Sequence, residues 1–356
     1  MLRLCEAVGL GGADSAEYAR TLLALLGSAA GRPLGLPPAD TFLSDDHTPV
    51  EYSLSFAPGA EPVLRVLLEP GYGAGSLAEN GRAGLRAVRG AARRWGFDTM
   101  RLDVLEDLFF PADPQGPLAL WCALELLPGG VPKVKVYLNP AASGQERSAA
   151  TVREALRRLG HREAFEALPP GDRHLFFALD LGDWDEPRVK VYLAHDGLSA
   201  AEAPGLSRTG AAPERLEIER FFRTASGRGT GGPGGADELL DRRPGLTCHA
   251  FTDTETALPG GFTLHVPVRD YARHDGEALD RAVAVLGHHG IDAAPLVRSL
   301  AAVTSRRLTD GVGLIAYLGL AHQQGRPPRV NAYISSEAYA VRPPAGPSLR
   351  RARAGH

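Results

Sequence analysis

The chain has 356 residues, of which 44% are apolar and 23% charged, a balance typical of a globular protein with enough apolar surface for a core. Its formal net charge of −3 excludes a general binder of polyanions, so we expect no nucleic-acid partner and only local anion sites. The N-terminus lacks the apolar run of a signal peptide and no stretch reaches the length of a transmembrane helix, so we expect a cytoplasmic protein without membrane association. Three widely separated cysteines have no metal-ligand spacing, and we expect reduced thiols.

Ten segments have the composition of strands, and short connectors join them into five β-hairpins. In chain order the predicted hairpins pair residues 50–56 with 63–69, 118–127 with 134–138, 175–181 with 188–193, 246–252 with 262–268, and 312–320 with 329–335. The segments between them have apolar residues at helical spacing. The predicted helices cover residues 78–95, 99–108, 147–159, 213–223, 277–286 and 293–302.

This order predicts an α+β fold in which five α-α-β-β units repeat along the chain. A sheet of ten antiparallel strands tends to curl, and closing it into a barrel removes its edges. Ten strands leave a lumen too wide for side chains to fill, so we expect a solvent-filled chamber ringed by helices. We assign residues 1–344 to this single domain, with a Gly-rich flexible loop at about 225–236 and a disordered basic tail at 345–356.

Only three of the 39 basic residues are lysines, and two of them begin the same word, KVYL, at Lys135 and Lys190. Strand alternation places a set of cations on the faces opposite the apolar residues, and therefore toward the lumen. This set is Arg65, Lys135, Arg188, Lys190 and Arg329. Inward cations repel one another unless carboxylates lie between them or a multiply charged anion binds them. Since these faces carry few acids, a diphosphate is the favoured ligand; the alternative is a solvated, exposed sheet face.

Tyrosines accompany the cations at two-residue spacing, namely Tyr137, Tyr192 and Tyr333. An allylic diphosphate that ionises gives an anion, which needs positive charge, and a carbocation, which aromatic faces stabilise. Cation–tyrosine pairs supply both. Thr263, His265 and Asn331 share the same inward faces and are further candidates.

Glu51 follows Pro49 at the start of the first strand and alternates with Tyr52. An inward carboxylate there could accept a hydrogen bond from an indole N–H and enrich the ring in electrons; the alternative is a surface charge at a strand edge. Asp45 and Asp46 do not continue into the Asp-rich pattern that holds Mg²⁺ in chain-elongating prenyl synthases. We expect no cofactor and no strict metal requirement.

The chain resembles the indole prenyltransferases of the dimethylallyltryptophan synthase superfamily, which have a ten-stranded ABBA barrel. The words that carry the resemblance are TFLSDDHTPVEYSLSF, RVLLEPG, GPLALWCALEL, VKVYLNPAA, LDLGDWDEPRVKVYL, GFTLHVPVRDY, DGVGLIAYLGL and RVNAYISSEAY. They span essentially the whole chain and look most like bacterial 6-dimethylallyltryptophan synthases.

The resemblance implies that Glu51 holds the indole N–H, that Phe42 and Leu43 lie near the amino-acid substrate, that the five inward cations bind diphosphate and that the three tyrosines shield the allyl cation. Where fungal members that attack carbon 4 place a lysine, this chain has Trp121 or Cys122, so the base that rearomatises the ring is open, with Glu51 our candidate. His265, where some relatives have tyrosine, could bind diphosphate, shield the cation or only pack.

We therefore expect transfer of a dimethylallyl group from dimethylallyl diphosphate to the indole of L-tryptophan, at carbon 6, by electrophilic aromatic substitution. The alternatives are another indole position, the indole nitrogen or another aromatic acceptor such as tyrosine. A rival of another class is a non-catalytic barrel that binds isoprenoid diphosphates or aromatic ligands. The oligomeric state is left open between monomer and homodimer.

Overall fold

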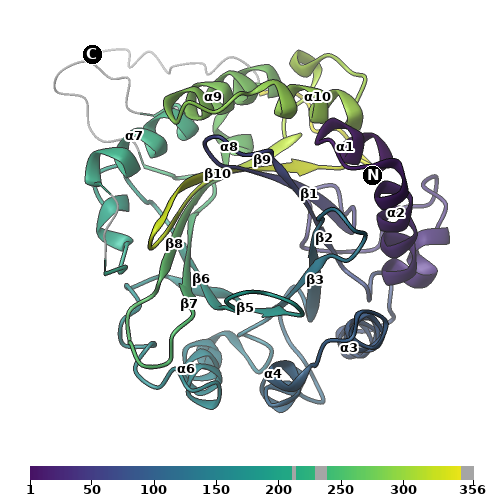
Figure 1. The fold of residues 1–356 in the computed structure, drawn as a ribbon, viewed down its shortest axis with the longest axis vertical. Coiled ribbons are helices and arrows are strands. Elements are labelled where there is room, and N and C mark those ends of the chain that lie inside the picture. The colour runs from purple at the N-terminus through teal and green to yellow at the C-terminus, as the bar shows by residue number, and fades with distance from the viewer. Residues whose placement is uncertain (211–213, 229–238, 346–356) are drawn as a thin grey trace, which may run out of the picture.

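The computed structural model describes residues 1–210, 214–228 and 239–345. Its strands close into an antiparallel barrel in the order β1-β10-β9-β8-β7-β6-β5-β4-β3-β2, and Figure 1 looks down the lumen. The strands are β1 Val50–Phe56, β2 Val63–Leu68, β3 Leu120–Glu125, β4 Lys133–Leu138, β5 Arg173–Leu181, β6 Val189–His195, β7 Gly245–Phe251, β8 Gly261–Val266, β9 Ile315–Gln323 and β10 Arg326–Ser335. The predicted ABBA barrel of five hairpins is confirmed.

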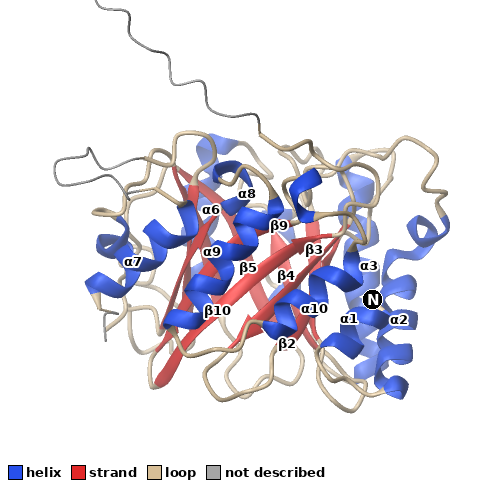
Figure 2. Ribbon diagram, turned by 90° about the horizontal axis from the view of Figure 1, so that it is seen from above, coloured by secondary structure: helices blue, strands red, loops and turns tan. Residues whose placement is uncertain are grey.

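Helices surround the barrel on its outside (Figures 1 and 2). They are α1 Leu2–Ala7, α2 Gly12–Leu26, α3 Leu77–Trp95, α4 Met100–Asp103, α5 Glu106–Phe109, α6 Ser148–Arg158, α7 Arg215–Ser226, α8 Val268–Tyr271, α9 Asp275–His288 and α10 Ala294–Val303. α3 shows why they form: Ser76 caps its N-terminus by accepting from the Glu79 N–H, and Gly96 ends it in the left-handed conformation. Its apolar face, with Leu85 and Val88, is buried.

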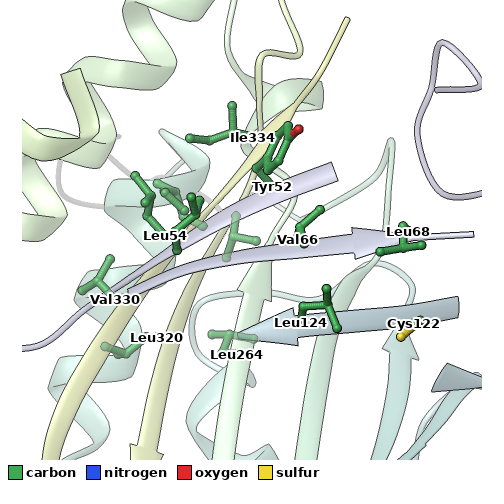
Figure 3. Packing of buried hydrophobic residues seen from close by; sticks show 14 of the residues in the cluster. Tyr52, Leu54, Val66, Leu68, Cys122, Leu124, Leu264, Leu320, Val330 and Ile334 are labelled. Atoms are coloured by element: carbon green, nitrogen blue, oxygen red, sulfur yellow. The ribbon is translucent and has the colours of Figure 1, made fainter. Parts of the chain in front are cut away.

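The core lies between the barrel wall and the helices, where outward side chains of neighbouring strands pack together (Figure 3). On β4 the outward residues Val134, Val136 and Leu138 are fully buried. Lys135 and Tyr137 alternate with them and line the lumen. The same alternation on β1 sends Leu54 to the core and Glu51 to the lumen. The period of two thus separates an apolar core from a polar chamber.

The predicted elements differ from the structure in a few places. The helix expected at 99–108 is two short helices, α4 and α5. α7 continues to Ser226, whose hydroxyl donates to the Phe222 carbonyl, so the predicted flexible loop at 225–236 is wrong at its first two residues. Residues 229–236 of that loop and 346–356 of the predicted tail lie outside the described residues. Ala345, at the start of that tail, donates its N–H to the Arg273 carbonyl.

Two N-terminal helices, α1 and α2, were not expected from the sequence; α1 packs against α10, near the opposite end of the chain. Within the described residues, no helix is both long and apolar enough to cross a membrane.

Candidate active site

One end of the lumen gathers the predicted cations in a solvent-open cavity of about 1050 Å³. All five line it: Arg65 from β2, Lys135 from β4, Arg188 just before β6, Lys190 from β6 and Arg329 from β10. Thr263 and Asn331 line it as well, as expected from their faces. Burial, together with repulsion from Arg65 and Arg188, lowers the pKa of Arg329 to about 10. The cluster therefore carries positive charge that its own surroundings do not fully compensate.

Two carboxylates that the sequence analysis did not single out lie among these cations. Glu125 on β3 accepts from Arg65 Nε at 2.8 Å. Asp180 on β5 is 1% exposed; it accepts from Arg188 Nε at 2.7 Å and lies 3.6 Å from the Nζ atoms of both Lys135 and Lys190. Strand alternation places both carboxylates inward, and it is the signal by which the sequence could locate them. Because the cations outnumber the two carboxylates, an anion-binding site remains.

Trp184 covers this end of the barrel from the turn between β5 and β6. The centroid of its ring lies 5.2 Å from Lys133 Nζ, 5.6 Å from Lys135 Nζ and 5.1 Å from the Arg188 guanidinium carbon. Its indole N–H donates to the carbonyls of Val134 and Leu181, at 2.9 Å each. The ring therefore contacts three cations through its face while its edge is fixed to the barrel wall.

The predicted tyrosines form a belt across the middle of the lumen. Ring centroids lie 5.6 Å apart for Tyr137 and Tyr192, 6.1 Å for Tyr192 and His265, and 5.6 Å for His265 and Tyr333. His265 Nε2 and the Tyr333 hydroxyl are hydrogen-bonded at 3.1 Å. Burial, with a further contribution from Lys190, lowers the pKa of His265 to about 4, so its imidazole is neutral near pH 7.

Glu51 faces the lumen beside this belt and is only 7% exposed. Burial raises the pKa of its carboxyl to about 7; Arg269 and Arg243 oppose the shift and Asp45 adds to it. Among the described residues nothing donates a hydrogen bond to this carboxylate. The alternative of a surface charge at a strand edge is therefore wrong. A buried carboxyl with open lone pairs and a pKa near neutrality can accept an N–H and take up a proton.

Beyond the belt lies a second, more apolar cavity of about 1670 Å³. Phe42 and Trp121 stack with centroids 6.2 Å apart, and Phe176 lies 5.2 Å from Trp121. Leu43 is buried beside them, whereas Phe42 is half exposed at the mouth. Glu51 and the belt residues Tyr137, Tyr192, His265 and Tyr333 line this cavity and the cationic one alike. The lumen is thus divided into a cationic and an aromatic chamber that meet at Glu51.

The structure distinguishes Trp121 from Cys122. Trp121 lines the aromatic chamber, whereas Cys122 points outward into the core, where burial raises its pKa to about 12. Trp121 is therefore the residue that faces the substrate space, and it carries no basic atom.

A polar group at the mouth of the aromatic chamber was not predicted. Arg243 and Arg269 approach Asp45 at 3.0 and 3.2 Å, and the Arg269 guanidinium carbon lies 5.3 Å from the Tyr317 ring centroid. The neighbouring Asp46 instead accepts from the Thr48 hydroxyl and from the Tyr339 N–H, and so orders the loop after Leu43. Across the described residues no three His, Cys, Asp or Glu side chains converge as a metal site.

The profile of a protein family described as tryptophan dimethylallyltransferase matches residues 18–207, more than half of the chain. The chain belongs to this family. It is an aromatic prenyltransferase with the ABBA barrel that the sequence predicted.

Solved structures support the assignment over nearly the whole length of this prenyltransferase. The prenyltransferase PriB, crystallised with L-tryptophan and dimethylallyl thiolodiphosphate, is 64% identical with a TM-score of 0.94, over 97% of this chain and 96% of that one. The 5-dimethylallyltryptophan synthase of Streptomyces coelicolor is 62% identical, with a TM-score of 0.91 over 98% and 96%. The 6-dimethylallyltryptophan synthase of Micromonospora olivasterospora is 40% identical, with a TM-score of 0.86 over 96% of each chain.

Proposed function

We propose that this prenyltransferase moves a dimethylallyl group from dimethylallyl diphosphate to the indole ring of L-tryptophan. The observation that carries the proposal is the divided lumen, in which a cationic and an aromatic chamber meet at a buried carboxylate and a tyrosine belt. Relatives at 62–64% identity have been crystallised with tryptophan and a thio analogue of this donor. A chamber for each substrate, joined where the new bond would form, suits a reaction between the two.

In the cationic chamber the five predicted cations bind the diphosphate. As the bond between carbon 1 of the allyl group and oxygen breaks, its electron pair leaves with the diphosphate, and fixed cations stabilise the growing negative charge. The allyl cation that remains faces the tyrosine belt. Aromatic faces stabilise it through their quadrupole and keep water away, so that it meets the indole before it is hydrolysed.

In the aromatic chamber Glu51 accepts the indole N–H and orients the ring, while Phe42, Leu43 and Trp121 pack against it. The ring's π electrons form the carbon–carbon bond, and the arenium ion then loses a ring proton. Glu51 is our candidate for the base that takes it. Arg269 and Asp45 at the mouth offer opposite charges for the carboxylate and ammonium of a free amino acid.

We further propose that no divalent metal is strictly required. The five fixed cations line the chamber and supply the positive charge that Mg²⁺ would otherwise supply to the leaving group. This prenyltransferase would then need no cofactor.

For the position on the ring we propose carbon 6, because the sequence segments quoted above most resemble those of bacterial 6-dimethylallyltryptophan synthases. Carbon 5 is a second candidate, because the chain is 62–64% identical to a 5-dimethylallyltryptophan synthase and 39–40% identical to 6-dimethylallyltryptophan synthases. Proton NMR of the product separates them. In the 6-isomer, H-4, which shows a nuclear Overhauser effect to the side-chain methylene, keeps an ortho-coupled neighbour; in the 5-isomer it does not.

The experiment that tests the whole proposal is incubation of the purified protein with L-tryptophan and dimethylallyl diphosphate, followed by mass spectrometry and NMR. A prenylated tryptophan and released diphosphate are expected. Prenylation of only another acceptor, such as tyrosine, would correct the substrate. Tight binding of both ligands without turnover would instead support a non-catalytic binding barrel.

A further inference from the structure

Asp180 is an unusual residue to find in a site for a polyanion. It is directly opposite Lys135 across the β4–β5 ladder and is 1% exposed. A carboxylate in this place repels a diphosphate, so its presence needs a compensating benefit.

Its two oxygens contact the cations in different ways. Oδ2 accepts from Arg188 Nε at 2.7 Å, which fixes a guanidinium that lines the chamber. Oδ1 has no hydrogen-bond partner among the residues that the structure describes, although Lys135 Nζ and Lys190 Nζ each lie 3.6 Å away. At that distance the carboxylate attracts the ammonium groups without occupying their N–H donors. Those donors stay available to a ligand.

Lys190 depends on this attraction more than a surface lysine would. It is 7% exposed, and burial followed by repulsion from Lys135 and Arg188 holds its pKa well below the ordinary value, although Asp180 acts to raise it. Among the described residues, the ionisable groups that act most strongly on Lys190 are Asp180 on β5, Lys135 on β4, Arg188 beside it and Cys248 on β7, and His265 on β8 is also within its influence. Burial keeps Cys248 in its thiol form and His265 neutral. Among these groups Asp180 is the carboxylate.

We infer that Asp180 is a positioning residue that keeps Lys190 protonated and converged with Lys135 and Arg188 before the donor arrives. It acts through the lysine rather than on the substrate. The role rests on the proposed function, because it prepares the site for the diphosphate of the donor.

The chain offers a direct test, since its three lysines, Lys133, Lys135 and Lys190, can be followed individually by ¹³C NMR after isotope labelling. In ligand-free protein, Asp180→Asn should lower the titration midpoint of Lys190 by at least about one pH unit. Glu125→Gln is the matched control: it removes the carboxylate that pairs with Arg65, a guanidinium that does not titrate, and should leave that midpoint within about 0.3 pH units. An unchanged Lys190 midpoint in Asp180→Asn overturns the inference, whatever reaction the enzyme catalyses.

Binding of inorganic diphosphate, measured by calorimetry at two pH values, supplies the second readout. The ratio of dissociation constants, Asp180→Asn over wild type, should rise at least about fivefold from pH 6.5 to 8.5, because the variant loses the Lys190 charge earlier. Combining Asp180→Asn with Lys190→Arg should abolish this rise, since a guanidinium keeps its charge. If the ratio of dissociation constants is the same at both pH values, whether Asp180→Asn binds diphosphate more tightly or more weakly than wild type, the carboxylate only repels or only packs and the inference fails. If wild type binds no diphosphate, the proposed function fails instead, while the NMR result still stands.

Discussion

Glu51 is the residue at which the two chambers meet, and its burial has both a chemical and a thermodynamic consequence. The chemical one concerns turnover. Glu51→Gln keeps the shape and one acceptor oxygen but loses charge and basicity. We expect turnover with tryptophan to fall by at least about a hundredfold, within the usual range for acid–base groups. Steady-state kinetics with tryptophan measures the loss. Diphosphate binding by the variant is the control for an intact donor chamber. Unchanged turnover in a stable variant would place the acceptor elsewhere in the barrel.

The thermodynamic consequence concerns stability against pH. Burial raises the pKa of Glu51 from 4.5 to about 7, so the folded state binds this proton more tightly than the unfolded chain. Wild type therefore loses stability as pH rises from about 4.5 to about 7, by up to about 3 kcal/mol, and a glutamine does not. In urea unfolding at pH 5, 6, 7 and 8, the free energy of unfolding of Glu51→Gln relative to wild type should increase up to about pH 7. Above that pH the difference should stay constant. A pH-independent difference would contradict the burial argument.

The lysines of the cationic chamber permit a comparison between neighbours on one strand. Lys135 faces the centre of the cluster, whereas Lys133 lies nearer the rim and pairs at 3.6 Å with the exposed Asp185. Lys135→Met should lower kcat/KM for the donor by at least about tenfold, equivalent to roughly 1.4 kcal/mol in the transition state. Lys133→Met should cost less than about threefold, because Lys133 pairs with an exposed carboxylate near the rim and such pairs contribute little. Equal losses would mean that the diphosphate binds at the rim.

At the scale of elements, the turn of the β5–β6 hairpin lies over the cations, and its Trp184 contacts them. Trp184→Ala should raise KM for the donor by at least about fivefold, because three cation–π contacts are lost together. Trp184→Phe keeps an aromatic face but loses the N–H bonds to Val134 and Leu181, and should retain at least half of the wild-type affinity if the face matters most. The KM for the donor should be measured for both variants under the same conditions. If Trp184→Phe raises it as much as Trp184→Ala does, the N–H bonds rather than the aromatic face support donor binding.

The strands are also where the sequence was most informative. Side chains alternate along a strand with a period of two, and the lumen-facing positions that this period predicts for Arg65, Lys135 and Glu51 agree with the structure. The same alternation predicts that Asp180 faces the lumen. Its strand is otherwise mostly apolar, so the pattern alone does not mark this single acid as part of the site. Arg269 could not be found in this way, because it follows β8 in the short helix α8. Its place at the chamber mouth depends on how distant loops meet.

At the scale of the whole molecule, closure of the barrel brings together charges that lie far apart in the chain. β1 pairs with β10, so Arg65 on β2 and Asn331 on β10 come within 3.4 Å across 266 positions of sequence. An open sheet would leave the cations on a solvated face, where water and salt screen them. The closed wall instead keeps them partly buried and mutually repelling, which lowers the pKa of Arg329 and favours a polyanionic ligand.

The concentration of fixed charge in one chamber bears on the metal requirement of the enzyme. A fold that supplies Arg65, Lys135, Arg188, Lys190 and Arg329 to one chamber replaces with fixed charge what a divalent cation would supply to the leaving group. Turnover with dimethylallyl diphosphate and tryptophan should therefore keep more than about half of its value after dialysis against EDTA and in its continued presence. Lys135→Met should become more dependent on added Mg²⁺ than wild type, because one fixed charge is missing. Complete loss of wild-type turnover in EDTA, restored by Mg²⁺, would show that the cationic chamber does not carry the leaving group alone.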